Sequence, residues 1–328
     1  MVRLEVTLDV FSGNPNPTWE MPEDKVKEFF QMKGWKELMI SDDNSNLNLG
    51  YKGFIISVLS DDDEKIDLNR DEIPKSKHTN LPSTFRIYGQ GLLEEESTND
   101  FKRSLDSEEI QEKEKWLLET SGGKLFKTMD NNGRETASDD AAQDLYKYVE
   151  DTISGKNATT TINNDSEPQM EKDEESVEAL ATCNLRATYY NPSFWNDIRY
   201  IRNNNCYNYA MGKRTNTFAQ PGRAHGCNFT MNCTSVASAA RCDGVITNCQ
   251  GSTPYYYVAL VIWPNNDYHW YHWHMERFWG HKPGQTAAKN TDNSGRVIAG
   301  SLSPRNCNRG PYTVFCGYYY GPTNATIR

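Results

Sequence analysis

The residues best suited to acid–base chemistry gather between positions 267 and 295. This stretch, DYHWYHWHMERFWGHKPGQTAAKNTDNSG, holds four of the six histidines of the chain. An imidazole on a strand can act as a general base, ligate a metal or line an aromatic binding surface. The histidines are His269, His272, His274 and His281, and the tryptophans Trp263, Trp270, Trp273 and Trp279 lie beside them.

The near-alternation of histidines and aromatic residues predicts a β-strand over 268–274 with side chains on both faces. The turn that follows carries Pro283 and Gly284, which favour chain reversal. Alternation places three residues on each face: His269, Tyr271 and Trp273 on one, and Trp270, His272 and His274 on the other.

The candidate nucleophile is Cys206 in NNNCYNYAMGKR, where a short helix is expected to begin. A helix N-terminus favours a thiolate, and a histidine on a nearby strand can take its proton. In this hypothesis His269 is the base, and Asn204 supplies an oxyanion donor. A third polar group would orient the imidazole: Asp292, or its neighbours Asn290 and Asn293.

Three alternatives stay open for these residues. Cys206 can be a structural disulfide cysteine, which would leave no nucleophile. His272 and His274, with His281 or His225, have the spacing of metal ligands, although we predict no metal and no other cofactor. The aromatic residues can also line a pocket for a planar small molecule, or form a carbohydrate-binding or interaction surface without catalysis. The pocket candidates are Trp270, Tyr271, His272, Trp273, His274 and His281.

All eight cysteines lie at or after residue 183, and the first 182 residues have none. No CxxC pair exists, so the pattern indicates disulfides in an extracellular domain rather than a structural zinc site. If Cys206 is free, another cysteine must also be free or pair between chains. The disulfide candidates are Cys183, Cys227, Cys233, Cys242, Cys249, Cys307 and Cys316.

Glycosylation sequons agree with an extracellular protein. No apolar run is long enough to span a bilayer, and we expect that a secretory leader is absent from this chain. The sequence therefore predicts a secreted protein. The N-x-S/T acceptors are Asn157, Asn164, Asn228, Asn232 and Asn324.

Charge divides the chain into two parts. Residues 183–328 hold 14 Lys and Arg against 5 Asp and Glu, whereas the preceding part holds 21 against 40. Opposite charges of this kind favour docking of the acidic half on the basic half, as a pro-segment docks, or attraction of an anionic target. The basic residues are spread out and form no nucleic-acid-binding motif, so nucleic acid is not an expected partner.

Composition and periodicity predict an α+β protein with two domains. An acidic α+β domain covers 1–153, an acidic disordered linker covers 154–182, and a Cys-, Tyr- and Trp-rich α+β domain covers 183–328. A long loop is expected over 214–254. The other expected elements are strands at 3–11, 53–59, 83–91, 255–263 and 313–321, and helices at 22–30, 107–120 and 138–153.

Several motifs resemble those of an uncharacterised two-domain family: LDVFSGNPNPTW, NNCYNYA, DYHWY, HKPGQT and TDNSG. The order of a helix-borne cysteine and a strand-borne histidine also resembles papain-like thiol hydrolases. These resemblances imply Cys206, His269 and Asp292 as functional positions. In size and aromatic character the chain also resembles the secreted luciferases of syllid worms, which implies a cofactor-free, oxygen-using oxidoreductase.

The sequence thus predicts a thiol hydrolase or acyl transferase that acts on an amide bond of a small-molecule or peptide substrate. A luciferase-type enzyme with an aromatic substrate pocket is the first alternative. A non-catalytic secreted binding protein is the second.

Overall fold

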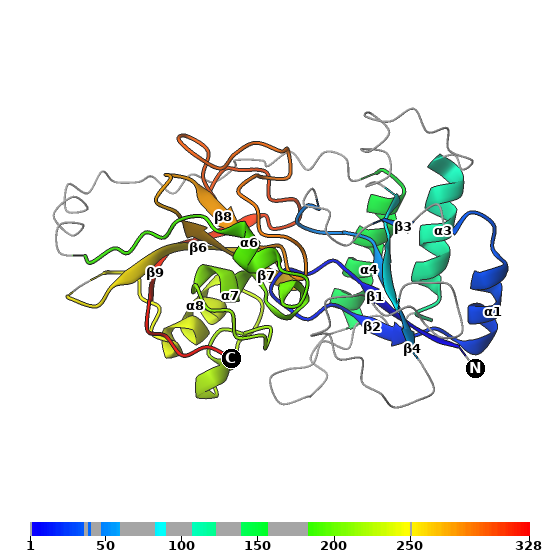
Figure 1. Ribbon diagram of the computed structural model, residues 1–328, viewed down its shortest axis with the longest axis horizontal. Helices are drawn as coiled ribbons and strands as arrows, with labels where there is room; N and C mark the ends of the chain where they lie inside the picture. The colour runs from blue at the N-terminus through cyan, green and yellow to red at the C-terminus, as the bar shows by residue number, and fades with distance from the viewer. Residues whose placement is uncertain are drawn as a thin grey trace. The chain divides into compact units, whose positions relative to one another are not determined.

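A computed structural model describes residues 2–35, 39–40, 47–59, 83–89, 107–122, 139–156, 183–249 and 251–328. The chain forms two compact units (Figure 1). Unit 1 comprises Met1–Val10, Pro15–Leu47 and Tyr51–Ala158, and unit 2 comprises Phe11–Asn14, Asn48–Gly50 and Thr159–Arg328. Two short pieces of the N-terminal sequence therefore belong to the second unit.

Unit 1 is built on an antiparallel sheet in the order β2-β1-β4-β5-β3. Its first strand alternates exposed and buried residues as the sequence predicts, and Leu4, Val6 and Leu8 are fully buried. The central β4 is apolar on both faces over most of its length. The strands are β1 (Arg3–Leu8), β2 (Thr18–Glu20), β3 (Met39–Ile40), β4 (Phe54–Leu59) and β5 (Thr84–Ile87).

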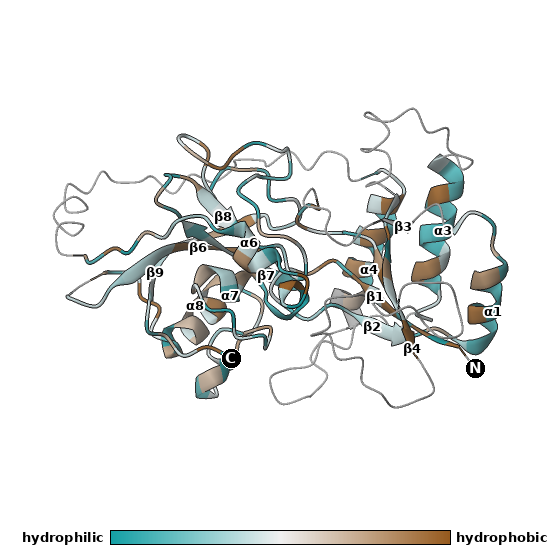
Figure 2. Ribbon diagram, viewed as in Figure 1, coloured by the Kyte–Doolittle hydropathy of each residue, from teal (hydrophilic) through white to brown (hydrophobic). Residues whose placement is uncertain are grey.

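Within its described residues, unit 1 also has the helices α1 (Glu23–Gln31), α3 (Ser107–Glu119) and α4 (Asp139–Ile153). Apolar and hydrophilic residues alternate along α1 and α3 at helical spacing (Figure 2). Phe29 on α1 packs against both Trp35 and Trp116. The helices expected at 22–30, 107–120 and 138–153 are therefore present.

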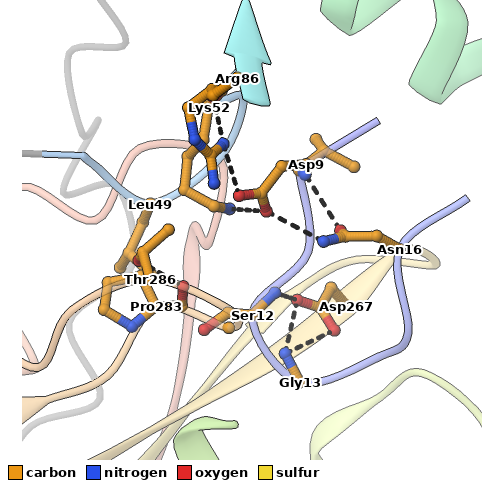
Figure 3. Close-up of polar contacts among 12 residues, drawn as sticks. Asp9, Ser12, Gly13, Asn16, Leu49, Lys52, Arg86, Asp267, Pro283 and Thr286 are labelled. Atoms are coloured by element: carbon orange, nitrogen blue, oxygen red, sulfur yellow. Dashed lines mark hydrogen bonds and ion pairs between the residues drawn. The ribbon is translucent and has the colours of Figure 1, made fainter. Parts of the chain in front are cut away.

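A buried charge cluster lies inside unit 1. The carboxylate of Asp9 lies 3.2 Å from the ammonium nitrogen of Lys52 and 2.8 Å from a guanidinium nitrogen of Arg86 (Figure 3). The side-chain amide of Asn16 donates a third contact, at 2.9 Å. The cluster links β1, the start of β4 and β5 through one carboxylate.

Unit 2 contains an antiparallel sheet in the order β8-β7-β6-β9. Trp263 and Asp267 close a tight hairpin between β6 and β7, and Asn265 adopts a positive φ of 61° in the turn. The expected pairing of these two strands is confirmed. The strands are β6 (Tyr255–Trp263), β7 (Asp267–Trp273), β8 (Trp279–His281) and β9 (Val314–Pro322).

Helices α7 (Cys206–Ala210) and α8 (Cys233–Cys242) pack on this sheet, α7 against β7 and α8 against β6 and β9 (Figure 1). The expected loop over 214–254 is wrong in part, because α8 lies inside it. Asn232 caps this helix by accepting a hydrogen bond from the backbone N–H of Ser235, and three alanines follow within VASAA. The abundance of Cys, Asn and Ser obscured this signal. The part of unit 2 that the structure describes also has the short helices α6 (Pro192–Asn196), η2 (Ile201–Asn203) and η3 (Arg223–His225).

Three disulfides stabilise unit 2: Cys183–Cys249, Cys227–Cys242 and Cys233–Cys316. Cys206 and Cys307 are free and buried, so the candidate Cys307 is not a disulfide partner. The α+β class and the disulfide-stabilised second domain are thus confirmed. Most of the expected linker, 157–182, lies outside the described residues, as do the sequons Asn157 and Asn164.

Candidate active site

The candidate site of unit 2 is assembled around the segment Phe11–Asn14. Asp267, the first residue of β7, accepts hydrogen bonds from three successive backbone N–H groups of this segment. Figure 3 draws those from Ser12 and Gly13. The nitrogen–oxygen distances are 2.5 Å for Ser12, 3.1 Å for Gly13 and 2.7 Å for Asn14. A carboxylate that binds consecutive amides fixes the backbone of the segment, so Ser12 is held beside the start of β7.

A chain of hydrogen bonds begins at the hydroxyl of Ser12. Its Oγ lies 2.5 Å from Nδ1 of His269. The other ring nitrogen of His269, Nε2, lies 2.9 Å from Nδ1 of His281 on the adjacent strand β8. Nε2 of His281 lies 2.9 Å from the carbonyl oxygen of Thr291.

The donor and acceptor capacities of these atoms fix the direction of the hydrogen bonds. Burial lowers the pKa of His281 to about 3, so this imidazole is neutral and has one N–H. That proton lies on Nε2, because the carbonyl of Thr291 can only accept. Nδ1 of His281 therefore accepts from Nε2–H of His269. When His269 is neutral, its own Nδ1 has no proton and accepts from Ser12. The arrangement presents an imidazole as a proton acceptor, as a general base requires.

Cys206 is the fourth member of the site. Its side chain is fully buried and forms a hydrogen bond with the Ser12 side chain. Its Sγ also lies 3.9 Å from the carbonyl oxygen of Tyr268. Burial, reinforced by the nearby Asp267, raises the pKa of the Cys206 thiol well above its usual range. The resting thiol is therefore protonated, and the Ser12 hydroxyl bridges it to His269.

Local capping positions Cys206 at the start of α7. The side chain of Asn205 accepts hydrogen bonds from the backbone N–H groups of Tyr207 and Asn208, and the side-chain oxygen of Asn208 accepts one from the backbone N–H of Asn205. Just upstream, the buried ammonium of Lys282 donates at 2.6 Å to the carbonyl of Asn204. It donates at the same distance to the carbonyls of Ile201 and Gly284, which ties α7 to the loop after β8.

The carbonyl oxygen of Gly13 is bound as tightly as the amides of its segment. It accepts hydrogen bonds from the side-chain amide of Asn205 at 2.9 Å and from that of Gln220 at 2.8 Å. The hydroxyl of Tyr268 lies 3.3 Å from the same oxygen. The neighbouring carbonyl of Ser12 accepts from the backbone N–H of Cys206 at 3.5 Å.

Two residues expected in the site lie elsewhere. Asp292 accepts from the backbone N–H groups of Ser294 and Asn308, so it organises its own loop. The same segment instead supplies the carbonyl of Thr291, and the group that faces His269 is His281. Asn204 donates to the carbonyl of Tyr200 and to Asn216 rather than pointing at the thiol, since its amide closes a loop.

The other face of β7 is packed core. His272 bonds to the carbonyl of Ala210 and to the hydroxyl of Thr188, and His274 bonds to the hydroxyl of Tyr209. Burial lowers the pKa of His272 to about 3 and that of His274 to about 4. Trp270 is fully buried against Tyr207 and Tyr319.

The remaining candidates have equally defined surroundings. Tyr271 is buried and packs against the rings of both His269 and His281, and the half-buried Trp273 packs against Trp279. Across the described ranges, no group of three His, Cys, Asp or Glu side chains is placed to hold a metal ion. The described sequons Asn228, Asn232 and Asn324 are exposed.

Sequence reasoning missed Ser12 and Asp267, and it assigned His281 to the pocket rather than to the imidazole chain. The motif LDVFSGNPNPTW, which contains Ser12, stood out only as a shared opening. Nothing in its local pattern indicates a contact with residues about 255 positions away. Asp267 lies just outside the strand expected over 268–274, and in the structure it is the first residue of β7.

The fold and the site define a disulfide-stabilised α+β protein with a buried Cys–Ser–His–His hydrogen-bond network. The chain is 42% identical over 150 residues to insoluble matrix shell protein 1 of Ruditapes philippinarum. That alignment covers 43% of this chain and 93% of the relative. The chain therefore belongs to the family of this shell protein. No family model matches it, and no solved structure matches it.

Within the described residues, no helix is long and apolar enough to cross a membrane.

Proposed function

We propose that this chain is a secreted thiol-dependent hydrolase or acyl transferase that acts on an amide bond. Cys206 is the nucleophile, His269 the base and His281 the residue that orients the base. The observation that carries the proposal is the hydrogen-bond chain from Ser12 through His269 and His281 to the carbonyl of Thr291. It leaves the nitrogen of His269 that faces Ser12 as a proton acceptor, and Ser12 contacts Cys206.

The placement of the three residues supports a papain-like arrangement. A short helix carries the cysteine and packs on the strand that carries the histidine. The third group comes from the next strand of the sheet and contacts the other nitrogen of the imidazole. The imidazole of His281 takes the place of the usual carboxamide or carboxylate. Like those groups, it holds the base in one tautomer.

The chemical steps follow from these positions. As substrate binds, His269 takes the proton of the Cys206 thiol, and Sγ attacks the carbonyl carbon of the amide. The C–N bond breaks, the amine leaves with the proton from His269, and a thioester remains on Cys206. Water or an acceptor amine then attacks the thioester and restores the thiol. Because the pKa of the resting thiol is raised, the proton acceptor is essential.

Secretion is part of the proposal. Three disulfides form in unit 2, as in proteins of oxidising compartments. Three described sequons are exposed and so are accessible to glycosylation. The name of the relative places that protein in a shell matrix, which supports an extracellular location for this chain.

The test compares two buried free thiols of the same unit. Cys206→Ala should abolish hydrolysis of a fluorogenic peptide-amide library, by about a thousandfold or more, with little change in melting temperature. Cys307→Ala is the matched control and should retain activity. Unchanged turnover in Cys206→Ala, or equal loss in both variants, would contradict the proposal.

A second pair of variants tests the role of His281. Asparagine at this position can still accept from His269 Nε2, whereas phenylalanine cannot. His281→Asn should therefore keep more activity than His281→Phe, and the difference should appear in kcat rather than in KM. Equal activity of the two variants would remove His281 from the mechanism.

A non-catalytic extracellular matrix protein is the second candidate. The name of the relative favours it, and so does the complete burial of Cys206, Ser12 and His269. In that case the hydrogen-bond network only stabilises unit 2. Cys206→Ala would then leave every measured activity unchanged and would lower the melting temperature.

A further inference from the structure

The segment Phe11–Asn14 is recognised in unit 2 as a bound peptide is recognised. Its backbone amides at Ser12, Gly13 and Asn14 all donate to Asp267. The carbonyl oxygens of Ser12 and Gly13 both accept hydrogen bonds from unit 2. These partners lie about 190 to 255 positions away in sequence, so they form a site that is distant from the segment along the chain.

Unit 2 also makes specific contacts with the side chains of the segment. The ring of Phe11 packs edge-on against Trp263, with ring centroids 6.0 Å apart. A Cβ at Gly13 would lie 2.5 Å from the ring of Tyr268, so only glycine fits there. The amide of Asn14 donates to the carbonyl of Asn266 at 2.9 Å.

The segment also occupies the space between the proposed nucleophile and its base. The Ser12 hydroxyl contacts both Cys206 and His269, where a nucleophile and its base would otherwise meet. The Ser12 carbonyl accepts from the backbone N–H of Cys206, which is the donor that an oxyanion at this position would use. A substrate carbonyl and the Ser12 carbonyl cannot occupy this position together.

We infer that unit 2 contains a binding site for a peptide of the type aromatic–Ser–Gly–Asn, and that residues 11–14 fill it as a built-in pseudosubstrate. The inference rests on the proposed function in assigning this segment to the place of the substrate. An external peptide with a small residue followed by glycine binds there after the segment leaves. Turnover therefore requires the segment to leave the site, so the native chain is active only in the fraction of molecules in which the segment has left.

The experiment measures access to Cys206 in the full chain. Native protein is treated with iodoacetamide, and alkylation of Cys206 and Cys307 is followed by peptide mapping. Gly13→Ala places a methyl group against Tyr268 and should displace the segment. Alkylation of Cys206 should accelerate about ten- to a hundredfold over the native chain, while Cys307 is unaffected.

A matched control separates displacement of the segment from general destabilisation. Gly244 in unit 2 has a φ of +90°, and a Cβ there would lie 2.9 Å from Pro322. Gly244→Ala should lower the melting temperature without exposing Cys206 selectively. Equal acceleration in both variants, or none in Gly13→Ala, would overturn the inference. Asn14→Ala, which removes one hydrogen bond of a partly exposed residue, tests a chain that keeps its fold if Gly13→Ala does not.

Peptide binding completes the test. The synthetic peptide Ac-VFSGNP-amide should slow alkylation of Cys206 in Gly13→Ala, and the same peptide with alanine in place of glycine should not. If both peptides protect equally or neither does, unit 2 has no site for this sequence. Protection does not require turnover, so a chain that binds the peptide but hydrolyses nothing would refute the enzyme and keep the binding site.

Discussion

The two units bury their charged groups in different ways. In unit 1 the carboxylate of Asp9 faces two cations, Lys52 and Arg86, in the protein interior. In unit 2 the carboxylate of Asp267 is bound by neutral donors, three backbone amides and the hydroxyl of Tyr312 at 2.6 Å. Both side chains are fully buried, and both are drawn in Figure 3.

The difference shows in their pKa values. Burial raises the pKa of Asp9, but the charges of Lys52 and Arg86 outweigh it, and the pKa is lowered overall. Burial also raises the pKa of Asp267, and there the hydrogen bonds offset it only in part, so the pKa is raised. A buried carboxylate that is paired with cations is a structural ion cluster. One that is held by amides anchors a segment of backbone.

The covalent links also separate the units, since the first 182 residues contain no cysteine. Replacing Cys233 and Cys316 by alanine opens a loop of 83 residues and should cost unit 2 about 4–5 kcal/mol. Replacing Cys227 and Cys242 opens 15 residues and should cost about 3 kcal/mol. Hydrogen exchange resolved by peptide should locate both losses in unit 2. The reverse order would show that native strain, rather than loop length, determines the effect.

In unit 1 the strongest single substitution should be Asp9→Asn. It leaves two buried cations without their charged partner, and we expect a loss of about 3–5 kcal/mol in the free energy of unfolding. Asp24→Asn on the exposed surface of α1 is the control. Urea denaturation at pH 7 measures both, and a loss below that of the control would show that the cluster is not a structural ion pair.

Replacing the buried Glu114 of unit 1 by glutamine should increase the stability of the chain above neutral pH. Burial raises its pKa from 4.5 to about 7, although Gly89 and Tyr51 both donate to it. A raised folded-state pKa contributes stability below the unfolded value, and that stability is lost as pH rises through about 7. Glu114→Gln keeps an acceptor oxygen for both donors. The variant should match the native chain at pH 4 and exceed it by about 2–3 kcal/mol at pH 8.

Thermal unfolding at several pH values measures this gain. A variant that is less stable at pH 8 would show that the ionised carboxylate is favoured in its site.

The smallest effect, about 1–2 kcal/mol, is expected for Asp267→Asn, because the amide oxygen can still accept part of the hydrogen bonds. Its pH dependence is the informative part. The pKa of Asp267 is raised, so the advantage of the native chain over this variant should shrink as pH rises. The advantage over Asp9→Asn should instead grow as pH rises, because the pKa of Asp9 is lowered. Slopes of the same sign would remove the contrast between the two carboxylates.

Local patterns predicted most of the fold. The sequence predicted three features that depend only on neighbours within a few residues. They are the alternation in β1, the apolar run of β6 and the hairpin into β7. Helix α8 was missed because its cysteines and polar flanks resemble a loop. The pairing of six cysteines could not be read, since spacing along the chain does not give distance in space.

The sequence by itself determined the α+β class, the confinement of disulfides to the second half, and the pair Cys206 and His269 as candidates. Only the tertiary structure placed the Ser12 hydroxyl between Cys206 and His269, and His281 against the other ring nitrogen of His269. It also turned Asp292 towards its own loop. Hydrogen-bond partners such as Ser12 and Asp267 lie about 255 residues apart, and no local propensity encodes a contact at that separation. The closing of the chain on itself decides which polar groups meet.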